Sequence, residues 1–598
     1  MSVHVVATAG HVDHGKSTLV RALTGMEPDR WEEERRRGLT IDLGYAWTTL
    51  PSGRDVAFVD VPGHERFLGN MLAGLGPAPV VCFVVAVDEG WQAQSGDHRD
   101  AVAALGIERG VVVLTRADRA PGRAEEVLAQ VRAELAGTGL RDAPAVTVSA
   151  LEGTGLDELR AALDDVLAQA PAPAGGRLRL WVDRSFTITG SGTVVTGTLA
   201  AGTLRQDDRL ELLGAGGARP VAVRGLHSRN RPAASLEPCA RVAVNLRGVP
   251  ADDVHRGDAL VTPGAWPVTG VLDVRRTTGS AFPLLAEQLV VHAGTAAVPA
   301  RLSPFDDDHA RLALDRPLPL VLGDRVVLRD PGSRSVLGGA LVLDADPPAL
   351  RRRGDRARRA ARLTGLDARG DVLAEVARRG AVPAERLHRL GLLPAADAAP
   401  PAGVRAAGGW WVHAPVLDAW QERLRTAVEE LHARDPLAAG LSRGAARDLL
   451  ALPDAALVDQ VVRGAGLAQE GGHIRSPQHR GGLGAHEPAV RRLEHRLAAE
   501  PFRAPEAEDL TALRLGAREL AAAERAGRLL RIGEGLVLLP TAPALAMREL
   551  ARLPQPFTTS QARQALGTTR RVAIPLLEHL DARGWTRRLD AGHRTVAR

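Results

Sequence analysis

Lysine is almost absent from this chain. Of its 76 basic residues only Lys16 is a lysine, so arginine carries nearly all the positive charge. The chain has 2 cysteines, Cys82 in an apolar stretch and Cys239 far from it, which favours reduced packing residues over a disulfide. No apolar run reaches the roughly 18 residues of a membrane-spanning helix, and no signal-peptide pattern is present. We therefore expect a soluble, cytoplasmic protein.

The single lysine stands in a pattern where arginine is a poor replacement. Residues 10–17 read Gly-His-Val-Asp-His-Gly-Lys-Ser, between a strand-like segment (3–7) and a helical one (17–23). Such a loop turns backbone amides toward phosphates, and a compact ammonium group fits beside them better than a wide, planar guanidinium. The pattern predicts a nucleoside triphosphatase. The expected nucleotide-binding residues of this loop are Asp13, His14, Gly15, Lys16, Ser17 and Thr18.

Two histidines of the loop, His11 and His14, also have the spacing of a His-x-x-His metal pair. The backbone of a phosphate-binding loop must turn its amides toward the ligand, and no third ligand follows at zinc spacing. The metal interpretation is therefore the less favoured one.

Downstream segments supply the other parts of a GTP site in the order that a GTPase uses them. Ser17 would place its hydroxyl on Mg²⁺. Asp60 ends a strand-like segment and would lie on the metal side, and the amide of Gly63 would meet the γ-phosphate. Thr40 lies in segment 35–42 and would close over the metal while GTP is bound. This segment is thus a candidate order-to-disorder switch.

The base is expected to be read by Thr115-Arg116-Ala117-Asp118, which ends the apolar strand 111–114. The Asp118 carboxylate can accept hydrogen bonds from both N1–H and N2–H of guanine, a pair of donors that adenine lacks. Ser149-Ala150-Leu151 follows strand 145–148 and would support the base edge by backbone contact. Each tripeptide alone is a weak signal, but their order at successive strand ends predicts a GTPase.

Together these motifs resemble the translational GTPases related to elongation factor Tu. The resemblance implies that His64, in Asp60-Val61-Pro62-Gly63-His64, orients the attacking water, and that Val12 and Leu39 form an apolar gate beside it. The guanine motif of that family begins Asn-Lys, so Thr115 and Arg116 depart from it. Arg116 can still lay its aliphatic stem over the base.

The pattern of apolar and polar residues along the chain changes twice. An Ala/Pro/Gly-rich linker lies near 170–176. From there to about 346, apolar and polar residues alternate as in β-strands, turn residues are frequent, and no long helical pattern is evident. From about 363, short amphipathic helices precede hairpin-like stretches in a loose repeat. We predict a multidomain protein: an α/β P-loop GTPase domain (1–172), two small β-barrels (176–264 and 265–347) and about four tandem winged-helix modules (363–598).

Charge is distributed unevenly between the two halves. Residues 1–349 carry a net −7 and residues 350–598 a net +12. This favours a nucleic-acid-binding C-terminal region, although arginine-rich, solvated helix faces would give the same balance. In the last repeat an apolar stripe from Ala573 to Leu580 predicts a helix, but Pro575 leaves its start open. The expected RNA-binding residues are Arg570 and Arg571 at that helix's N-terminal end, and Arg587, Arg588 and Arg594 in the wing.

Four further segments are similar to the selenocysteine-specific elongation factors, over essentially the whole chain. They are 38–45, 182–188, 192–198 and 322–331. The resemblance implies a pocket for the selenocysteine of a charged tRNA between the GTPase domain and the first barrel. Its residues here would be Tyr45, which is the only tyrosine, Asp183, Arg184 and Arg241. A selenol is largely ionised at neutral pH and a serine hydroxyl is not, so arginines there would favour selenocysteine; a core-edge tyrosine beside ordinary surface arginines is the alternative.

The implied function is delivery of selenocysteyl-tRNA to the ribosome at recoded UGA stop codons, with GTP/GDP and Mg²⁺ as cofactors. The winged helices would bind a hairpin in selenoprotein mRNA, and we expect a monomer with no membrane partner. One alternative is a regulatory GTPase whose winged-helix tail binds DNA; only the elongation factor predicts protection of an aminoacyl ester. A GTPase-driven metabolic transferase would need a second catalytic domain, which the sequence does not show.

Overall fold

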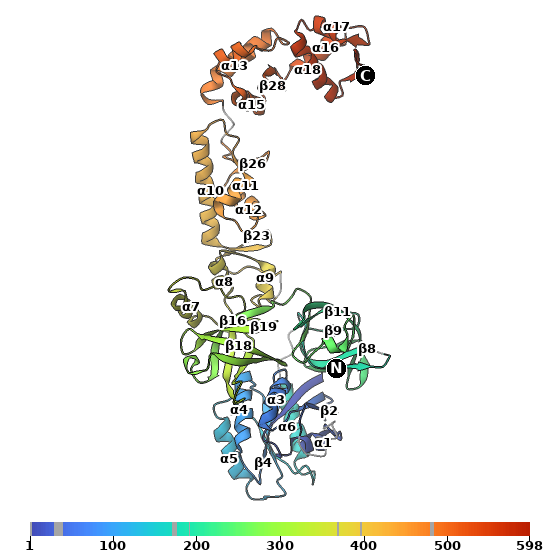
Figure 1. The fold of residues 1–598 in the computed structure, drawn as a ribbon, viewed down its shortest axis with the longest axis vertical. Helices are drawn as coiled ribbons and strands as arrows, with labels where there is room; N and C mark the ends of the chain where they lie inside the picture. Colours follow the sequence, from blue (N-terminus) through green and yellow to red (C-terminus); the bar gives the residue numbers. More distant parts are fainter. Residues whose placement is uncertain are drawn as a thin grey trace. The chain divides into compact units, whose positions relative to one another are not determined.

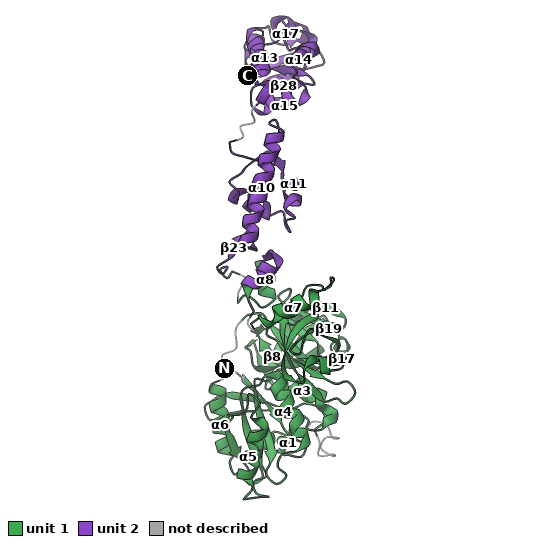
Figure 2. Cartoon of the chain, turned by 90° about the vertical axis from the view of Figure 1, so that its left-hand side faces the viewer, with its two compact units in different colours: residues 1–372, 384–399 green, residues 373–383, 400–598 purple. Residues whose placement is uncertain are grey.

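The computed structural model describes residues 3–28, 40–169, 176–190, 192–367, 370–394, 397–478 and 483–597. The chain forms two compact units, one of residues 1–372 and 384–399 and the other of residues 373–383 and 400–598 (Figure 2). Gly38, Leu39 of the predicted gate and most of the predicted switch lie outside the described residues.

The N-terminal part of the first unit contains a six-stranded sheet in the order β2-β3-β1-β4-β5-β6. Figure 1 draws this part in blue to cyan, with β2 and β4 labelled among helices α1, α3, α4, α5 and α6. Its strands are β1 (Val3–Ala9), β2 (Gly44–Thr49), β3 (Asp55–Asp60), β4 (Val80–Ala86), β5 (Gly110–Thr115) and β6 (Ala145–Thr147). All neighbours are parallel except β2 and β3. Strand β4 is buried along its whole length, as expected for a strand covered on both faces.

Helices cover both faces of this sheet. Side chains of α3 (Leu68–Leu75), α4 (Ala93–Leu105) and α5 (Ala124–Leu135) share one core with one face of the strands, and side chains of α1 (Lys16–Thr24) and α6 (Leu156–Ala168) share a second core with the other. The loops that follow β1, β3 and β5 therefore meet at the carboxyl edge of the sheet, where ligands bind in such folds.

The next part is a seven-stranded sheet in the order β10-β15-β7-β8-β14-β11-β12, and an additional β10–β11 pairing closes it into the first barrel, with β12 outside the ring. Its strands are β7 (Arg179–Ile188), β8 (Gly192–Ala201), β10 (Arg209–Gly214), β11 (Gly217–Ser228), β12 (Arg231–Ala233), β14 (Ala240–Arg247) and β15 (Ala259–Val261). The short β9 (Leu204–Arg205) and β13 (Ser235–Leu236) pair separately. The inner side chains form one apolar cluster, which includes Val182, Val195 and Val244.

A closed barrel follows, in the order β16-β19-β18-β17-β20-β21. Its strands are β16 (Thr269–Gly279), β17 (Gln288–Ala293), β18 (Ala296–Pro304), β19 (His309–Leu318), β20 (Arg325–Arg329) and β21 (Val336–Asp344). Burial alternates along β18, so that every second side chain points into the barrel. Helices α7 (Asp355–Thr364) and α9 (Ala384–Arg389) complete the unit.

The second unit repeats helices followed by small sheets. Its elements are α8 (Val372–Arg379), β22 (Ala381–Pro383), β23 (Val404–Ala407), β24 (Trp410–His413), α10 (Ala414–Arg434), β25 (Leu441–Ser442), α11 (Arg443–Leu450), α12 (Leu457–Gly464), β26 (Ala468–Glu470), β27 (His473–Arg475), α13 (Glu487–Ala499), α14 (Ala507–Ala512), α15 (Ala517–Arg525), β28 (Leu530–Gly533), β29 (Leu536–Leu538), α16 (Ala542–Leu550), β30 (Phe557–Thr558), α17 (Thr559–Ala565), α18 (Arg570–Ala582), β31 (Thr586–Arg588) and β32 (His593–Val596). Pro575 lies inside α18, which begins at Arg570.

Candidate functional site

The loop between β1 and α1 adopts a backbone that only certain residues allow. Gly10 has φ +133°, and a Cβ atom there would lie 2.1 Å from the backbone oxygen of Val84. Gly15 precedes α1 with φ +79°, and Asp13 has φ +63°. These left-handed positions turn the loop back on itself before the helix begins, which is the shape that lets consecutive amides converge on a phosphate.

A cavity of about 590 Å³ opens beside this loop. Its walls come from segments that are far apart in sequence but meet at one edge of the sheet: Val12, Asp13, Gly15, Lys16, Ser17, Thr18, Arg21, Glu27, Thr40, Gly63, Thr115, Arg116, Asp118, Arg119, Ala150 and Leu151. The structure thus brings together nearly all the predicted nucleotide-binding residues. His14 and Ser149 are the exceptions, because both are buried behind the lining.

Lys16 is held inside the loop. Its Nζ donates to the backbone oxygens of Gly10, at 2.9 Å, and His11, at 2.7 Å. A Cβ atom on Gly63 would lie 2.5 Å from the backbone nitrogen of Val12 and 2.5 Å from this Nζ, so only glycine lets the segment after β3 come this close to the loop. The ammonium group and the Gly63 backbone therefore face the same small space.

Ser17, Thr40 and Asp60 form an all-oxygen group, in which Ser17 and Thr40 line the cavity and Asp60 is buried behind them. Ser17 Oγ donates to Asp60 Oδ2 at 2.6 Å and lies 3.0 Å from Thr40 Oγ1. Thr8 Oγ1 donates to Asp60 Oδ1 at 2.7 Å. Burial raises the pKa of the Asp60 carboxyl, against the hydrogen bond from Ser17. Two hydroxyls and a buried carboxylate suit a hard cation such as Mg²⁺, whose charge would favour the ionised carboxylate.

His64 lies at the start of the 3-10 turn η1 (Glu65–Phe67), directly after Gly63. Its Nδ1 accepts from the backbone N–H of Arg66 at 3.2 Å, and its ring centroid is 6.1 Å from that of Phe67. The ring is not among the residues that line the cavity, whereas Val12 of the predicted gate is. The role of His64 in positioning water remains a prediction.

Thr115 and Arg116 connect the base-reading segment to the phosphate-binding loop. Thr115 Oγ1 donates to the backbone oxygen of His14 at 2.7 Å. The Arg116 guanidinium donates to the backbone oxygen of Asp13 and pairs with Glu89 at 2.6 Å. The two residues that replace Asn-Lys thus anchor the loop from the side, while Asp118 lines the cavity where a base would lie.

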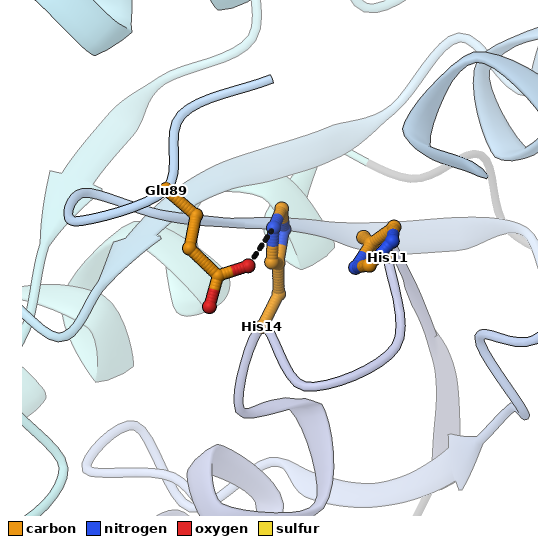
Figure 3. A group of neighbouring side chains, drawn as sticks. All are labelled: His11, His14 and Glu89. Carbon is orange, nitrogen blue, oxygen red and sulfur yellow. Dashed lines mark ion pairs between the residues drawn. The ribbon is translucent and has the colours of Figure 1, made fainter. Parts of the chain in front are cut away.

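His11, His14 and Glu89 form a cluster that could be mistaken for a metal centre (Figure 3). His14 Nε2 lies 3.6 Å from Glu89 Oε2, and one ligand atom from each of the three residues lies within 4.8 Å of the others. Burial, and then His11, lower the pKa of His14 to about 3, so its imidazole is neutral. Sequence spacing did not identify Glu89.

Charge weighs against a cation in this cluster. Lys16 and Arg116 both act on His14 as positive charges, and Arg116 already pairs with Glu89. A metal ion would have to compete with the guanidinium for the carboxylate and would face the ammonium group of the phosphate loop. We therefore assign the cluster to holding the loop and the segment after β4 together.

Tyr45, on β2, meets three charged side chains of the first barrel. The Arg241 guanidinium, from β14, lies 3.8 Å from the Tyr45 ring centroid, and that of Arg184, from β7, lies 5.6 Å from it. Arg241 pairs with both carboxylate oxygens of Asp183, at 2.8 Å for Oδ1. Burial raises the pKa of the Tyr45 phenol, so it stays neutral. The predicted aminoacyl residues are therefore one cluster.

The two arginines of this cluster are held differently. Burial alone would lower the pKa of Arg241, but the Asp183 carboxylate holds it above its usual value. Arg184 instead lies 3.5 Å from Asp42 Oδ2 and 3.4 Å from the backbone oxygen of Leu43, at the outer limit of hydrogen-bond length. Arg241 is committed to its pair, whereas Arg184 is only loosely engaged.

In the last repeat of the second unit, four predicted RNA-binding arginines are exposed: Arg570, Arg571, Arg587 and Arg588. Arg571 pairs with Glu506, which precedes α14. Arg594 is only 6% exposed, and its Nε donates to Asp581 Oδ2 at 2.8 Å. The prediction for Arg594 is corrected: its guanidinium supports the wing from inside and is not presented to a ligand.

Comparison with known proteins places the chain in a family. The family model of the elongation factor Tu GTP binding domain matches residues 1–169, and that of elongation factor Tu domain 2 matches 192–261. The selenocysteine-specific elongation factor beta-barrel domain matches 276–349, and the elongation factor SelB winged helix matches 548–595. The selenocysteine-specific elongation factor of Escherichia coli (strain K12) is 34% identical over 98% of both chains. The chain belongs to the selenocysteine-specific elongation factor family.

Two further members of the family are similar over nearly the whole chain. The relative from Desulfomicrobium baculatum is 31% identical over 98% of both chains. A crystal structure of a bacterial selenocysteine-specific elongation factor is 25% identical, covers 100% of both chains and superimposes with a TM-score of 0.75. The chain is therefore a translational GTPase that binds guanine nucleotide and hydrolyses GTP, and the predicted fold class is confirmed. In the described part of the chain, no helix has the length and apolar character to cross a membrane.

The structure of this family member also shows site residues that sequence reasoning missed. Arg21, Glu27 and Arg119 line the nucleotide cavity. Arg21 follows Ser17 by one turn of α1, so helical periodicity could have identified it. Glu27 pairs with Arg21 at 3.1 Å, and nothing in its local sequence indicates this.

Proposed function

We propose that this chain brings selenocysteyl-tRNA to the ribosome at recoded UGA stop codons and binds an mRNA hairpin through its last winged-helix module. The observation that carries the proposal is the Tyr45 cluster, in which two arginines of the barrel meet the only tyrosine beside the end of the predicted switch. We further propose a cytoplasmic monomer with the predicted domain boundaries.

In this proposal each part of the nucleotide site has one task. Lys16 would neutralise phosphate charge, Gly63 would present its amide to the γ-phosphate, and Asp118 would pair with guanine. Ser17, Thr40 and Asp60 would hold Mg²⁺, which would offset the charge of the β- and γ-phosphates. The Arg66 N–H occupies Nδ1 of His64, so Nε2 would orient the attacking water once ribosome binding brings the ring to the cavity.

The aminoacyl pocket would discriminate by charge. The charges of Arg241 and Asp183 offset each other, and this pair would form one side of the pocket together with Tyr45. Arg184 would supply the positive charge that meets a selenolate, because its present contacts are long and easily exchanged. A serine hydroxyl carries no charge, so it would gain little from the same guanidinium. Selectivity would then reside mainly in Arg184.

The RNA contact would come from the exposed arginines of the last module. Arg570 and Arg571 lie at the N-terminal end of α18, where backbone amides and guanidinium groups together suit a phosphate, and Arg587 and Arg588 lie on β31. Arg571 would exchange Glu506 for a phosphate when RNA binds.

Ester protection tests this proposal. The hydrolysis rate of the aminoacyl ester is measured for selenocysteyl-tRNA and seryl-tRNA, with GTP and with GDP. We expect protection of selenocysteyl-tRNA with GTP only. Arg184→Ala should reduce that protection by about tenfold or more, as expected for losing a charge-assisted contact worth about 1.5–3 kcal/mol, with little effect on seryl-tRNA. Equal protection of both esters by the wild-type protein would contradict the proposal, and equal loss for both with Arg184→Ala would assign this residue to the tRNA backbone.

A further inference from the structure

One arginine outside the predicted pocket contacts both the nucleotide side and the aminoacyl side of the first unit. Arg256 lies in the loop between the 3-10 turn η2 (Ala251–Asp253) and β15. Its Nη2 donates to Asp42 Oδ1 at 2.6 Å and its Nη1 to Asn70 Oδ1 at 2.7 Å. Its Nε donates to the backbone oxygen of Asp183 at 3.0 Å. A single guanidinium therefore joins three segments.

Two of these segments follow the expected γ-phosphate contacts. Asp42 comes two residues after Thr40, whose hydroxyl lies 3.0 Å from Ser17 Oγ. Asn70 is on α3, just after Gly63 and His64, and its Nδ2 donates to the backbone oxygen of Ile41 at 2.9 Å. Segments in these two positions move with nucleotide state in GTPases. Arg256 thus contacts both of them directly.

The third segment belongs to the aminoacyl cluster. Asp183, whose backbone oxygen accepts from Arg256, holds Arg241 against the Tyr45 ring with its side chain. Ser17 contacts Thr40, Thr40 is two residues before Asp42 in the chain, and Asp42 contacts Arg256, which reaches this cluster.

The loop that carries Arg256 is anchored to both barrels of the first unit by close packing, a hydrogen bond and an ion pair. Gly257 has φ +91°, and a Cβ atom there would lie 2.9 Å from Ala296 Cα. The Gly257 N–H donates to the backbone oxygen of Val182 at 2.9 Å, and the buried Asp258 pairs with Arg316 at 3.1 Å. Arg256 therefore presents its donors from a fixed base, and the segment around Asp42 is the side that can move away.

The hydrogen bond between Arg256 and Asp42, on the side that can move, joins two charged groups. Burial would raise the pKa of the Asp42 carboxyl, but Arg256 holds it below its usual value. Hydrogen bonds between two ionised partners are shorter and stronger than neutral ones. Arg184, which would meet the selenolate, lies 3.5 Å from the same carboxylate, so a movement of Asp42 also changes the surroundings of Arg184.

We propose that Arg256 is a positioning residue that couples the nucleotide state to the aminoacyl pocket. With Thr40 closed on Ser17, Asp42 and Asn70 hold the guanidinium, which in turn supports the backbone of Asp183. When the switch opens, Arg256 loses Asp42, and the Asp183–Arg241 pair loses that support. By linkage, a filled pocket favours the closed switch by the same factor. This inference rests on the proposed function, but its first test does not.

The first test uses nucleotides alone. Arg256 holds the closed arrangement, which is the one that GTP favours. Arg256→Gln should therefore lower the binding affinity for a non-hydrolysable GTP analogue by about tenfold, while the affinity for GDP should stay within about twofold of the wild-type value. Arg219→Gln is the matched control, since Arg219 pairs with Asp253 at 2.6 Å in the neighbouring turn, whereas Arg256 pairs with Asp42. It should change neither affinity. Equal weakening of both nucleotides, or no change, would overturn the inference.

Asp42→Asn removes the carboxylate that pairs with Arg256, and so tests the same interaction through its other partner. It should lower the ratio of analogue to GDP affinity by a similar factor, and the double variant should fall little further than either single one, because both substitutions remove one interaction. Additive effects in the double variant would contradict a direct coupling between the two residues.

The second test reads the aminoacyl pocket. With selenocysteyl-tRNA, Arg256→Gln should reduce the ratio of protection with GTP to protection with GDP by about tenfold, while Arg219→Gln should preserve it. A wild-type protein that protects both esters equally would contradict the proposed function, and the nucleotide test would still decide the coupling. Selective protection that keeps its full GTP dependence in Arg256→Gln would overturn the coupling alone.

Discussion

At the scale of single residues, the space around Lys16 limits what this position can accept. Its Nζ lies between Gly10 O, His11 O and the Gly63 backbone, and the planar fork of an arginine is wider than this space. Lys16→Arg should therefore weaken GTP and GDP binding alike, by about tenfold or more, measured with a fluorescent nucleotide. Arg21→Lys, at an exposed cation of the same cavity, should have a smaller effect. Normal affinity in Lys16→Arg would show that the solitary lysine has no special role.

His64 gives a second prediction at this scale. His64→Ala should leave nucleotide affinity nearly unchanged, since the ring does not line the cavity. It should slow ribosome-stimulated GTP hydrolysis by a factor on the order of 10² or more, as expected for losing a group that positions water. Glu65→Ala, at the next residue of the same turn, is the control and should hydrolyse GTP normally. Unchanged hydrolysis in His64→Ala would remove this residue from the mechanism.

Single residues also differ in how far the sequence predicts their partners. Residues 10–17 form a local pattern whose geometry follows from its glycines, so its function can be inferred from these residues alone. Asp42 and Arg256 are 214 positions apart, and no periodicity links them. Arg594 shows the same limit, because its burial depends on Asp581, a partner that no motif indicates.

At the scale of elements, strands and helices could be predicted from the alternation and the helical periodicity of apolar residues. The burial of polar side chains within those elements could not be predicted in this way. His292 on β17 illustrates this: it is 4% exposed, and its Nε2 accepts from Arg329 Nε at 3.0 Å. Nothing in the pattern of β17 distinguishes this histidine from an exposed one. Its environment depends on the pairing of β17 with β20, which sequence spacing does not predict.

Burial of His292 predicts a pH dependence. Burial, and then Arg329, lower its pKa from 6.5 to about 3 in the folded state. The unfolded chain therefore binds more protons below pH 6.5, so stability is full above that value and falls as pH decreases toward 3. The loss should be about 1.4 kcal/mol per pH unit for this one group, well below pH 6.5. His292→Gln, whose carbonyl can still accept from Arg329, should flatten the slope of unfolding free energy between pH 6 and 4.5.

Denaturant unfolding of the first unit at several pH values measures this slope. His227→Gln, at an exposed position of β11, is the control and should leave the slope unchanged. An identical slope in His292→Gln and the wild-type protein would show that this histidine does not contribute to acid sensitivity.

At the scale of the whole molecule, the order of the domains could be predicted from changes in the residue pattern along the chain. The packing between the C-terminal repeats could not. If the predicted tandem modules were independent, the last repeat, residues 557–598, would be separable from the one before it. The structure instead gives residues 483–553 and 557–580 one common core, in which Phe557, Leu576 and Leu577 are fully buried. Each such side chain contributes about 1.5–3 kcal/mol. Removing residues 557–598 alone would therefore expose the core of the preceding repeat.

The informative truncation ends the chain after Gln478, which leaves the separate core between Ala407 and Ile474 intact. This protein should lose binding to the cognate mRNA hairpin, because the exposed arginines at 570, 571, 587 and 588 are gone. GTP hydrolysis and ester protection should persist, since the nucleotide cavity and the Tyr45 cluster lie wholly in the first unit. Retained hairpin affinity would place the RNA site elsewhere.

Full-length Arg571→Ala separates an RNA contact from a folding effect, because the side chain is exposed and its ion pair with Glu506 lies on the surface. If Arg571 meets a phosphate, hairpin affinity should fall and the slope of log K against log salt should decrease by about one. Arg552→Ala, which removes an exposed arginine paired with Glu549 on α16, is the matched control and should leave that slope unchanged. A slope that changes equally in both variants would reflect net charge alone, and tighter binding to duplex DNA than to any RNA hairpin would favour a regulatory role for the tail.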